Sequence, residues 1–217
     1  MLLKKNFTIY PNVSIGRKCR IDDGVILGFS EGDFNDKTTV GDNAIFRANT
    51  LVYEGVKIGK NFQTGPNVLI RENNIIGNEV VMWHGVTISP GNVIGDGCRI
   101  HAGSFLELVH LGKKVFIGPG VVFTDDPHPV NPSSRKHFGG ARVEDEAVIG
   151  ANVTILPHVK IGKRVVIGAG SVVTRDIPDG EVWVGNPARF LKKAEEVICE
   201  IGVEKHYPYV ECWGLRK

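Results

Sequence analysis

Apolar residues recur at every sixth position along most of this 217-residue chain. The column is nearly unbroken at Val40, Phe46, Val52, Ile58, Thr64, Ile70, Ile76, Met82, Ile88, Ile94, Ile100 and Leu106. The same spacing precedes it at Ile9, Ile15, Ile21 and Leu27, and it returns at Val143, Ile149, Ile155, Ile161, Ile167 and Val173. Because a helix surface repeats about every 3.6 residues and a strand every two, this period is typical of neither and predicts a repeat protein.

Glycine often follows the apolar residue, as in Ile58-Gly59 and Ile94-Gly95, and tolerates backbone angles that other residues avoid. Each repeat is therefore expected to form one short strand and one turn. Three such faces make a triangular coil of about eighteen residues, and stacked coils share one continuous core. The predicted fold class is an all-β solenoid, a parallel β-helix, because so strict a period disfavours an ordinary β-sandwich.

The period breaks in three places, which are insertions or slips in the coil: residues 29–39, 107–114 and 125–142. The third reads DDPHPVNPSSRKHFGGAR, and its prolines, histidines and adjacent carboxylates are incompatible with a β-helix wall. We expect it to form an extruded loop. Loops on a rigid scaffold are where binding and catalytic groups concentrate. We expect the first two breaks to shape a pocket for an acceptor.

After Val173 the six-residue pattern ends, and Leu191, Ala194, Ile198 and Ile201 follow at spacings of three and four. This spacing predicts a helix from residue 187 or 188 that caps the open end of the coil stack. The expected organisation is a β-helix catalytic domain over residues 1–187 and a C-terminal helix and tail over residues 188–217.

Composition narrows the function classes. The formal net charge is only +2, so no general affinity for polyanions follows and no nucleic-acid partner is expected. The N-terminus lacks an apolar run long enough for a signal peptide, and no later stretch is long enough to span a membrane. The sequence therefore predicts a cytoplasmic protein without a membrane partner.

Two motifs near the end of the column carry a family resemblance: IGAGSVVTRD at residues 167–176 and VGNPAR at residues 184–189. With the repeat and the loop, they resemble the hexapeptide-repeat acyltransferases over roughly residues 9–193. The stretch DPHPV at residues 126–130 looks like the His-Pro element of galactoside and maltose O-acetyltransferases. Residues 52–71 are more similar to acetyltransferases that act on nucleotide-linked amino sugars.

The resemblance implies a left-handed coil, acetyl-CoA as co-substrate, no metal, and a homotrimer with active sites between subunits. It also implies that His128 is the catalytic base, since imidazole titrates near neutral pH and takes the proton of the attacking group. Asp125 or Asp126 would orient that imidazole. The alternative is that His128 is an exposed loop histidine and that both aspartates are turn residues.

For the coenzyme, the motif match implies that Ala151, Ala169 and Thr174 meet the pantetheine arm. Arg175, Arg189 and Lys192 would face the nucleotide phosphates, because guanidinium and ammonium groups bind phosphate oxygens well. Each basic residue taken alone could equally belong to a solvated surface.

His84 and His101 lie seventeen residues apart, close to one coil, and could line the acceptor pocket. With His110 they offer a zinc site like that of γ-class carbonic anhydrases, although their places in the repeat differ. The sequence thus predicts an acetyl-CoA-dependent acetyltransferase acting on the amine of a small-molecule acceptor, a nucleotide-linked amino sugar. The alternatives are O-acetylation of a sugar or small alcohol, a carbonic anhydrase-like metalloprotein, and a non-catalytic scaffold.

Overall fold

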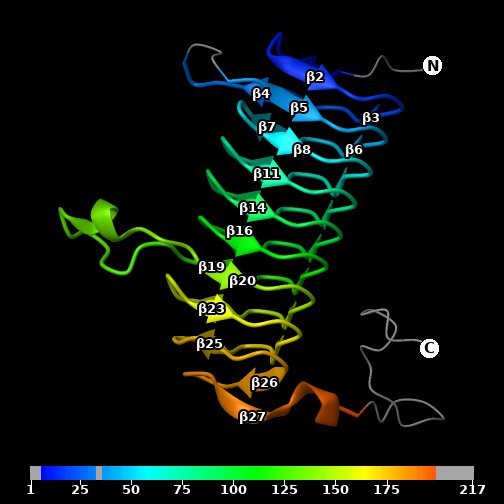
Figure 1. Cartoon of the computed structure of the whole chain (residues 1–217). Coiled ribbons are helices and arrows are strands. Elements are labelled where there is room, and N and C mark those ends of the chain that lie inside the picture. Colours follow the sequence, from blue (N-terminus) through cyan, green and yellow to red (C-terminus); the bar gives the residue numbers. More distant parts are fainter. Residues whose placement is uncertain (1–5, 33–35, 199–217) are drawn as a thin grey trace.

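A computed structural model describes residues 6–32 and 36–198 of the chain. Short strands wind around a three-sided prism, so that each coil contributes one strand to each of three parallel sheets (Figure 1). The chain passes along the front sheet toward the right and returns behind it while descending from the N-terminus, which makes the coil left-handed (Figure 1). The predicted parallel β-helix is confirmed.

Sheet A stacks nine strands in the order of the coils. They are β1 (Thr8–Ile9), β4 (Ile26–Phe29), β7 (Leu51–Tyr53), β10 (Leu69–Ile70), β13 (Thr87–Ile88), β16 (Phe105–Leu106), β19 (Val122–Phe123), β22 (Thr154–Ile155) and β25 (Val172–Val173).

Sheet B stacks the next strand of each coil. Its members are β2 (Val13–Ile15), β5 (Thr38–Val40), β8 (Lys57–Ile58), β11 (Ile75–Ile76), β14 (Val93–Ile94), β17 (His110–Leu111), β20 (Arg142–Val143) and β23 (Lys160–Ile161).

Sheet C completes each coil and adds a final antiparallel strand. It contains β3 (Arg20–Ile21), β6 (Ile45–Phe46), β9 (Gln63–Thr64), β12 (Val81–Met82), β15 (Arg99–Ile100), β18 (Phe116–Ile117), β21 (Val148–Ile149), β24 (Val166–Ile167), β26 (Glu181–Val184) and β27 (Arg189–Lys193).

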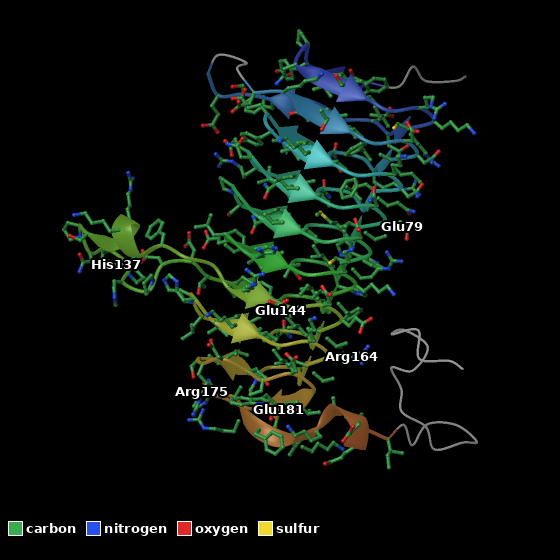
Figure 2. All side chains as sticks on the ribbon, viewed as in Figure 1. Glu79, His137, Glu144, Arg164, Arg175 and Glu181 are labelled. Atoms are coloured by element: carbon green, nitrogen blue, oxygen red, sulfur yellow. The ribbon has the colours of Figure 1, made fainter. Side chains whose placement is uncertain are left out.

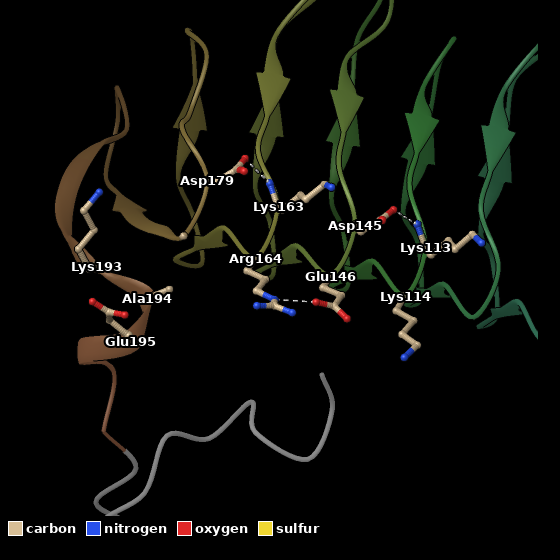
Figure 3. Close-up of a pocket in the computed structure, with 11 residues that line it drawn as sticks. Lys113, Lys114, Asp145, Glu146, Lys163, Arg164, Asp179, Lys193, Ala194 and Glu195 are labelled. Atoms are coloured by element: carbon tan, nitrogen blue, oxygen red, sulfur yellow. Dashed lines mark hydrogen bonds and ion pairs between the residues drawn. The ribbon is translucent and has the colours of Figure 1, made fainter. Parts of the chain in front are cut away.

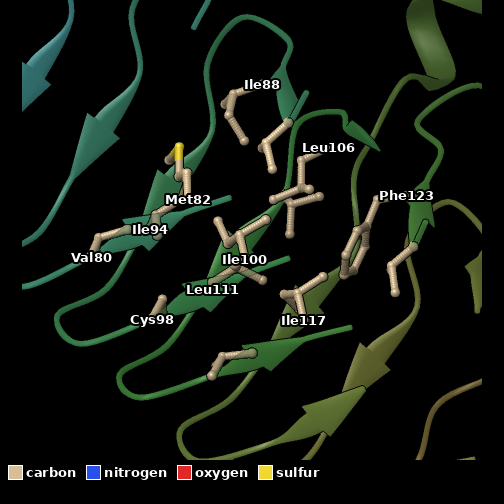
Figure 4. Close-up of a cluster of buried hydrophobic side chains, with 14 of the residues drawn as sticks. Val80, Met82, Ile88, Ile94, Cys98, Ile100, Leu106, Leu111, Ile117 and Phe123 are labelled. Carbon is tan, nitrogen blue, oxygen red and sulfur yellow. The ribbon is translucent and has the colours of Figure 1, made fainter. Parts of the chain in front are cut away.

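The interior is the predicted apolar column. From Val40 to Leu106 every member of the column is buried, and the parallel register places Ile70 beside Val52 and Ile88 in the neighbouring coils. Figure 4 shows how these side chains fill the narrow space between the three sheets. After Leu106 the next buried strand residue is Leu111, five positions on instead of six, which is the expected slip.

The three corners of the prism differ in regularity. We call them the A–B, B–C and C–A corners, after the sheets that each turn connects. The B–C and C–A turns hold a constant four residues between strands from coil to coil, as at 59–62 and 65–68. Both long interruptions leave from the A–B corner: residues 30–37 between β4 and β5, and residues 124–141 between β19 and β20 (Figure 1).

The C-terminal end differs from the expected helix. Over its described part the predicted helix is replaced by β27, which pairs with the free edge of β26, and by a short 3-10 turn, η2 (Ala194–Glu196). An exposed strand edge carries unpaired backbone groups, and a second strand satisfies them where a helix does not. The rest of the predicted helix and tail, residues 199–217, lies outside the described residues. No helix in the described ranges is long and apolar enough to cross a membrane.

Candidate active site

The extruded loop is held by its own hydrogen bonds. Asp126 Oδ1 accepts the backbone N–H of His128 at 2.8 Å and also the hydroxyl of Ser134. A 3-10 turn, η1 (Ser134–His137), follows, and it brings the His137 ring edge-on to the His128 ring with 6.0 Å between centroids. His128 is exposed on this loop, which projects from the same side of the prism as Arg175 (Figure 2). The Asp126 carboxylate thus fixes the main chain of His128, and its hydrogen bonds do not end on the imidazole.

The returning limb of the loop is clamped to the wall. His158 Nε2 lies 2.8 Å from the carbonyl oxygen of His137, and the His158 N–H donates to Gly139 O at 3.0 Å. A Cβ on Gly140 would lie 2.1 Å from Leu108 O, so glycine lets the two backbones touch. The loop therefore leaves the wall from a fixed base.

A carboxyl pair lies at that base. Glu107 follows β16 and Asp125 follows β19 in the next coil, and the two side chains are hydrogen-bonded. Partial burial, followed by the charge and hydrogen bond of Asp125 and the charge of Asp126, raises the pKa of Glu107 to about 7. The sequence prediction missed Glu107; the signal was its place directly after the column residue Leu106, one coil before Asp125.

The first insertion is tied down on the same corner. Ser30 donates to Glu54 at 2.6 Å, and Arg71 bridges to both oxygens of Glu72 while its guanidinium lies 4.6 Å from the centre of the Tyr53 ring. Five coils separate it from Asp125, which is about 24 Å at a strand spacing of about 4.8 Å. The two insertions therefore share a corner but lie far apart along the axis.

The C–A corner presents open backbone donors. Ala151 and Ala169 occupy the second position of this turn in successive coils, with the Gly170 N–H bonded to Ala151 O at 2.8 Å. Among the hydrogen bonds of residues 6–32 and 36–198, none has the N–H of Ala151 or Ala169 as its donor. A Cβ on Gly118 would lie 2.7 Å from Ala151 N, and one on Gly150 would lie 2.6 Å from Ala169 N. Glycine above each alanine thus leaves two amides uncovered.

The predicted phosphate-binding residues divide between two corners. Arg189 begins β27 directly after residues 185–188, which join β26 to β27 and bond to Val172 at the end of the last C–A turn. Lys192 lies on the same strand, where its Nζ is 3.4 Å from Glu196 O. Thr174 and Arg175 follow β25 on the A–B corner, and the Arg175 guanidinium lies 5.9 Å from the Trp183 ring centre. One chain therefore does not bring all the predicted coenzyme residues to one groove.

The histidines predicted to line the acceptor pocket lie on the C–A corner. His101 stacks on Trp83 with ring centroids 4.0 Å apart and an interplanar angle of 20°, and its other side contacts Phe116. Burial lowers the pKa of His101. His84 is exposed beside Trp83, whereas His110 lies on sheet B. The described residues contain no group of three His, Cys, Asp or Glu side chains that could hold a metal ion.

A broad hollow of about 880 Å³ lies on the B–C corner near the C-terminal end (Figure 3). Its charges are largely matched: Arg164 pairs with Glu146 at 2.7 Å, and Asp179 accepts the backbone N–H of Lys163 at 2.8 Å. None of the site residues predicted from the sequence lines it. Volume alone therefore does not mark the candidate site.

The outer faces of sheets A and B differ in chemistry. The outward residues of sheet A are apolar or threonine, namely Ile26, Leu51, Leu69, Thr87, Phe105, Val122, Thr154 and Val172, and all are partly exposed. The outward residues of sheet B include Lys57, His110, Arg142 and Lys160. A strip without charge along the height of the prism is typical of a surface that another protein covers.

Comparison with known proteins adds sequence relatives. A family model described as bacterial transferase hexapeptide (six repeats) matches residues 140–175. A provisionally named acetyltransferase of Schizosaccharomyces pombe is 33% identical over 149 residues, 60% of this chain and 72% of that protein. A galactoside O-acetyltransferase of Lactococcus lactis is 39% identical over 117 residues, 49% of this chain and 56% of that enzyme. The bifunctional protein GlmU of Clostridioides difficile is 29% identical over 193 residues, 89% of this chain and 39% of that protein.

Among solved structures, Francisella novicida UDP-N-acetylglucosamine acyltransferase has the same fold. The TM-score is 0.74 at 14% identity, over 88% of this chain and 70% of that chain. The chain spans 39% of the length of the GlmU relative and 56% of the galactoside enzyme.

Proposed function

The chain belongs to the hexapeptide-repeat acyltransferases, and on this premise we propose that it transfers the acetyl group of acetyl-CoA to the amine of a nucleotide-linked amino sugar. The observation that carries the proposal is the pair of uncovered amides at Ala151 and Ala169, on the corner that ends at Arg189. An extended arm bearing amide carbonyls can accept from both donors. Arg189 and Lys192 lie toward the C-terminal end of that line, where the arm's phosphates would reach them.

His128 supplies the base in this proposal. The neutral amine attacks the thioester carbonyl, a C–N bond forms, and the C–S bond breaks. His128 accepts the proton that the nitrogen loses and returns it to the leaving thiolate. Asp126 contributes by fixing the main chain that carries the imidazole, since its carboxylate accepts the N–H of His128.

A homotrimer completes the site in the same proposal. The A–B corner carries His128, Thr174 and Arg175, and the C–A corner carries Ala151 and Ala169. Sheet A separates the two corners within one chain. Packing the apolar face of sheet A around a three-fold axis would set the A–B corner of one subunit against the C–A corner of the next, and a groove between subunits supplies the concave site that a single prism lacks.

O-acetylation is the second candidate function. One of the relatives reported above, 39% identical over 117 residues, is a galactoside O-acetyltransferase by its name. The two candidates share the base, because an alcohol also loses one proton as it attacks. They differ in the acceptor.

The test is thiol release from acetyl-CoA with nucleotide-linked amino sugars, free amino sugars and galactosides, using wild type, His128→Ala and His137→Ala. We expect turnover with an amino sugar and a loss of about two to four orders of magnitude in kcat for His128→Ala. His137→Ala is the matched control, because it removes a second imidazole from the same loop and should retain most activity.

Other outcomes would redirect the proposal. Turnover with galactosides alone would favour O-acetylation. Equal activity of His128→Ala and wild type would remove His128 from the mechanism, and absence of thiol release with every acceptor would overturn the proposed function.

A further inference from the structure

The first position of the C–A turn is glycine in four of the eight coils, is Asp22 and Arg47 in the first two, and carries an aromatic ring in two adjacent coils. Gly65, Gly118, Gly150 and Gly168 occupy this position, whereas Trp83 and His101 stand between Gly65 and Gly118. The two rings stack 4.0 Å apart, close to the spacing of successive coils. They form a two-ring shelf with glycine at the same position in the coil on either side, Gly65 and Gly118.

One face of the shelf is covered and the other is open. His101 and, below it, Phe116 support the indole from the C-terminal side. On the N-terminal side the neighbouring position is Gly65, which has no side chain to lay over the indole. Trp83 is accordingly 38% exposed, which is high for the largest apolar side chain. The missing side chain leaves a gap about one coil thick, on the order of 5 Å.

The position of the shelf along the prism axis can be compared with that of the His128 loop and of the alanine amides. The loop with His128 leaves the coil that contains Gly118, while Ala151 and Ala169 lie one and two coils nearer the C-terminus. A three-fold axis parallel to the prism keeps these heights the same in a neighbouring subunit. The shelf therefore lies one to two coils, about 5–10 Å, to the N-terminal side of the loop base, opposite the coenzyme amides.

We propose that Trp83 and His101 bind the sugar ring of the acceptor, with the apolar face of the pyranose lying on the indole. This inference rests on the proposed function and names its acceptor subsite. The C–H groups of a pyranose face are apolar and fit the electron-rich face of an indole. Burial favours the neutral form of the His101 ring, so a cationic acceptor is not repelled.

The test measures binding without catalysis. Ligand-observed NMR would follow methyl glucosaminide, and separately uridine monophosphate, with trimeric wild type, Trp83→Leu and Trp83→Phe in the absence of acetyl-CoA. We expect Trp83→Leu to weaken sugar binding at least tenfold and Trp83→Phe to stay within about threefold of wild type. Binding of the nucleotide alone should not change. In turnover, Trp83→Leu should raise KM for the acceptor while kcat remains within a few fold.

Unchanged sugar binding in Trp83→Leu, or no sugar binding by wild type, would overturn the proposed sugar subsite. Loss of nucleotide binding instead of sugar binding would also overturn it. Dissociation of the trimer by Trp83→Leu would overturn it as well and would make Trp83 an interface residue. Because the binding arm needs no transfer step, sugar binding without thiol release would leave the shelf in place and overturn only the proposed function.

Discussion

The B–C and C–A corners are turns of the same length in the same coil, yet their backbone amides meet different partners. At the B–C corner the N–H at the second position donates to an Asp or Asn of the next coil wherever that coil carries one, as from Lys113 to Asp145 at 2.7 Å and from Lys60 to Asn78 at 2.9 Å. At the C–A corner the residue below Ala151 is Ala169, which offers no acceptor. The difference shows that a repeat fold leaves backbone donors open to a ligand wherever the next coil lacks an acceptor side chain.

The corner carboxylates also differ in the groups that they meet, and their pKa values shift in opposite directions. At the B–C corner the backbone N–H of Arg17 and then its side chain hold the pKa of Asp42 below its usual range. At the A–B corner Glu107 meets another carboxyl group, and its pKa rises. A corner carboxylate with a backbone donor is structural, whereas one without a donor is open to other chemistry.

Giving the C–A corner the acceptor side chain that the B–C corner has should have the largest effect, on the KM for acetyl-CoA. In Ala169→Asp the introduced carboxylate would accept the Ala151 N–H and repel coenzyme phosphates. We expect KM for acetyl-CoA to rise about tenfold to a hundredfold, equivalent to about 1.4–2.7 kcal/mol, from one lost hydrogen bond and like-charge repulsion. Steady-state kinetics and calorimetric titration with coenzyme A would measure it.

Ala169→Ser is the matched control, because its side chain is small and adds no charge. A KM for Ala169→Asp equal to that of wild type would show that Ala151 does not donate to the coenzyme.

The reverse change, at the B–C corner, should have a smaller effect and only on stability. Asp145→Ala removes the acceptor of the Lys113 N–H and should lower the free energy of unfolding by about 1 kcal/mol, with faster hydrogen exchange at that amide. Urea unfolding and exchange NMR would measure both. Asp145→Asn keeps an acceptor and should fall between the two proteins, while acetyl transfer stays the same in all three; a fall in transfer would contradict the contrast between the corners.

The smallest expected effect concerns Glu107. Its folded pKa, about 7, exceeds the ordinary value of 4.5, so the folded protein binds the proton more tightly than the unfolded chain does. This contribution to stability is complete below about pH 4.5 and is lost as pH rises through 7. Glu107→Gln should match wild type near pH 4.5 and be more stable at pH 8 by about 1 kcal/mol, after allowance for solvent screening. Parallel urea titrations at both pH values would show a constant difference if the pair does not share a proton.

The sequence was sufficient for the regular part of the fold. The column from Val40 to Leu106 identified the buried positions, because a period of six is compatible with one strand and one turn per repeat. Handedness came from the family resemblance, since a period has no hand. The C-terminal helix was wrong over residues 189–193, because Leu191 and Ala194 match helical spacing but the free edge of β26 favours a strand.

The site was harder to predict, because it depends on register between coils. The seventeen-residue interval relates His101 to His84, whereas the stacking partner of His101 is Trp83, at the coil interval of eighteen. The sequence leaves Asp125 and Asp126 open between orienting the imidazole of His128 and forming a turn, and the Asp126 carboxylate accepts the backbone N–H of His128 in such a turn. The uncovered amide of Ala151 has no signal in its own identity and becomes evident only when the next coil is laid beneath it.

The fixed rise per coil also sets the distances between groups along the prism axis to whole multiples of one spacing. The Trp83–His101 shelf, the base of the His128 loop and the amides of Ala151 and Ala169 lie at levels that differ by whole coils. Each level is about 4.8 Å from the next, and fractional adjustment is not available to a closed backbone ladder. Accommodation of a longer acceptor or acyl group within this scaffold would therefore proceed in steps of one whole coil, gained or lost between the shelf and the amides.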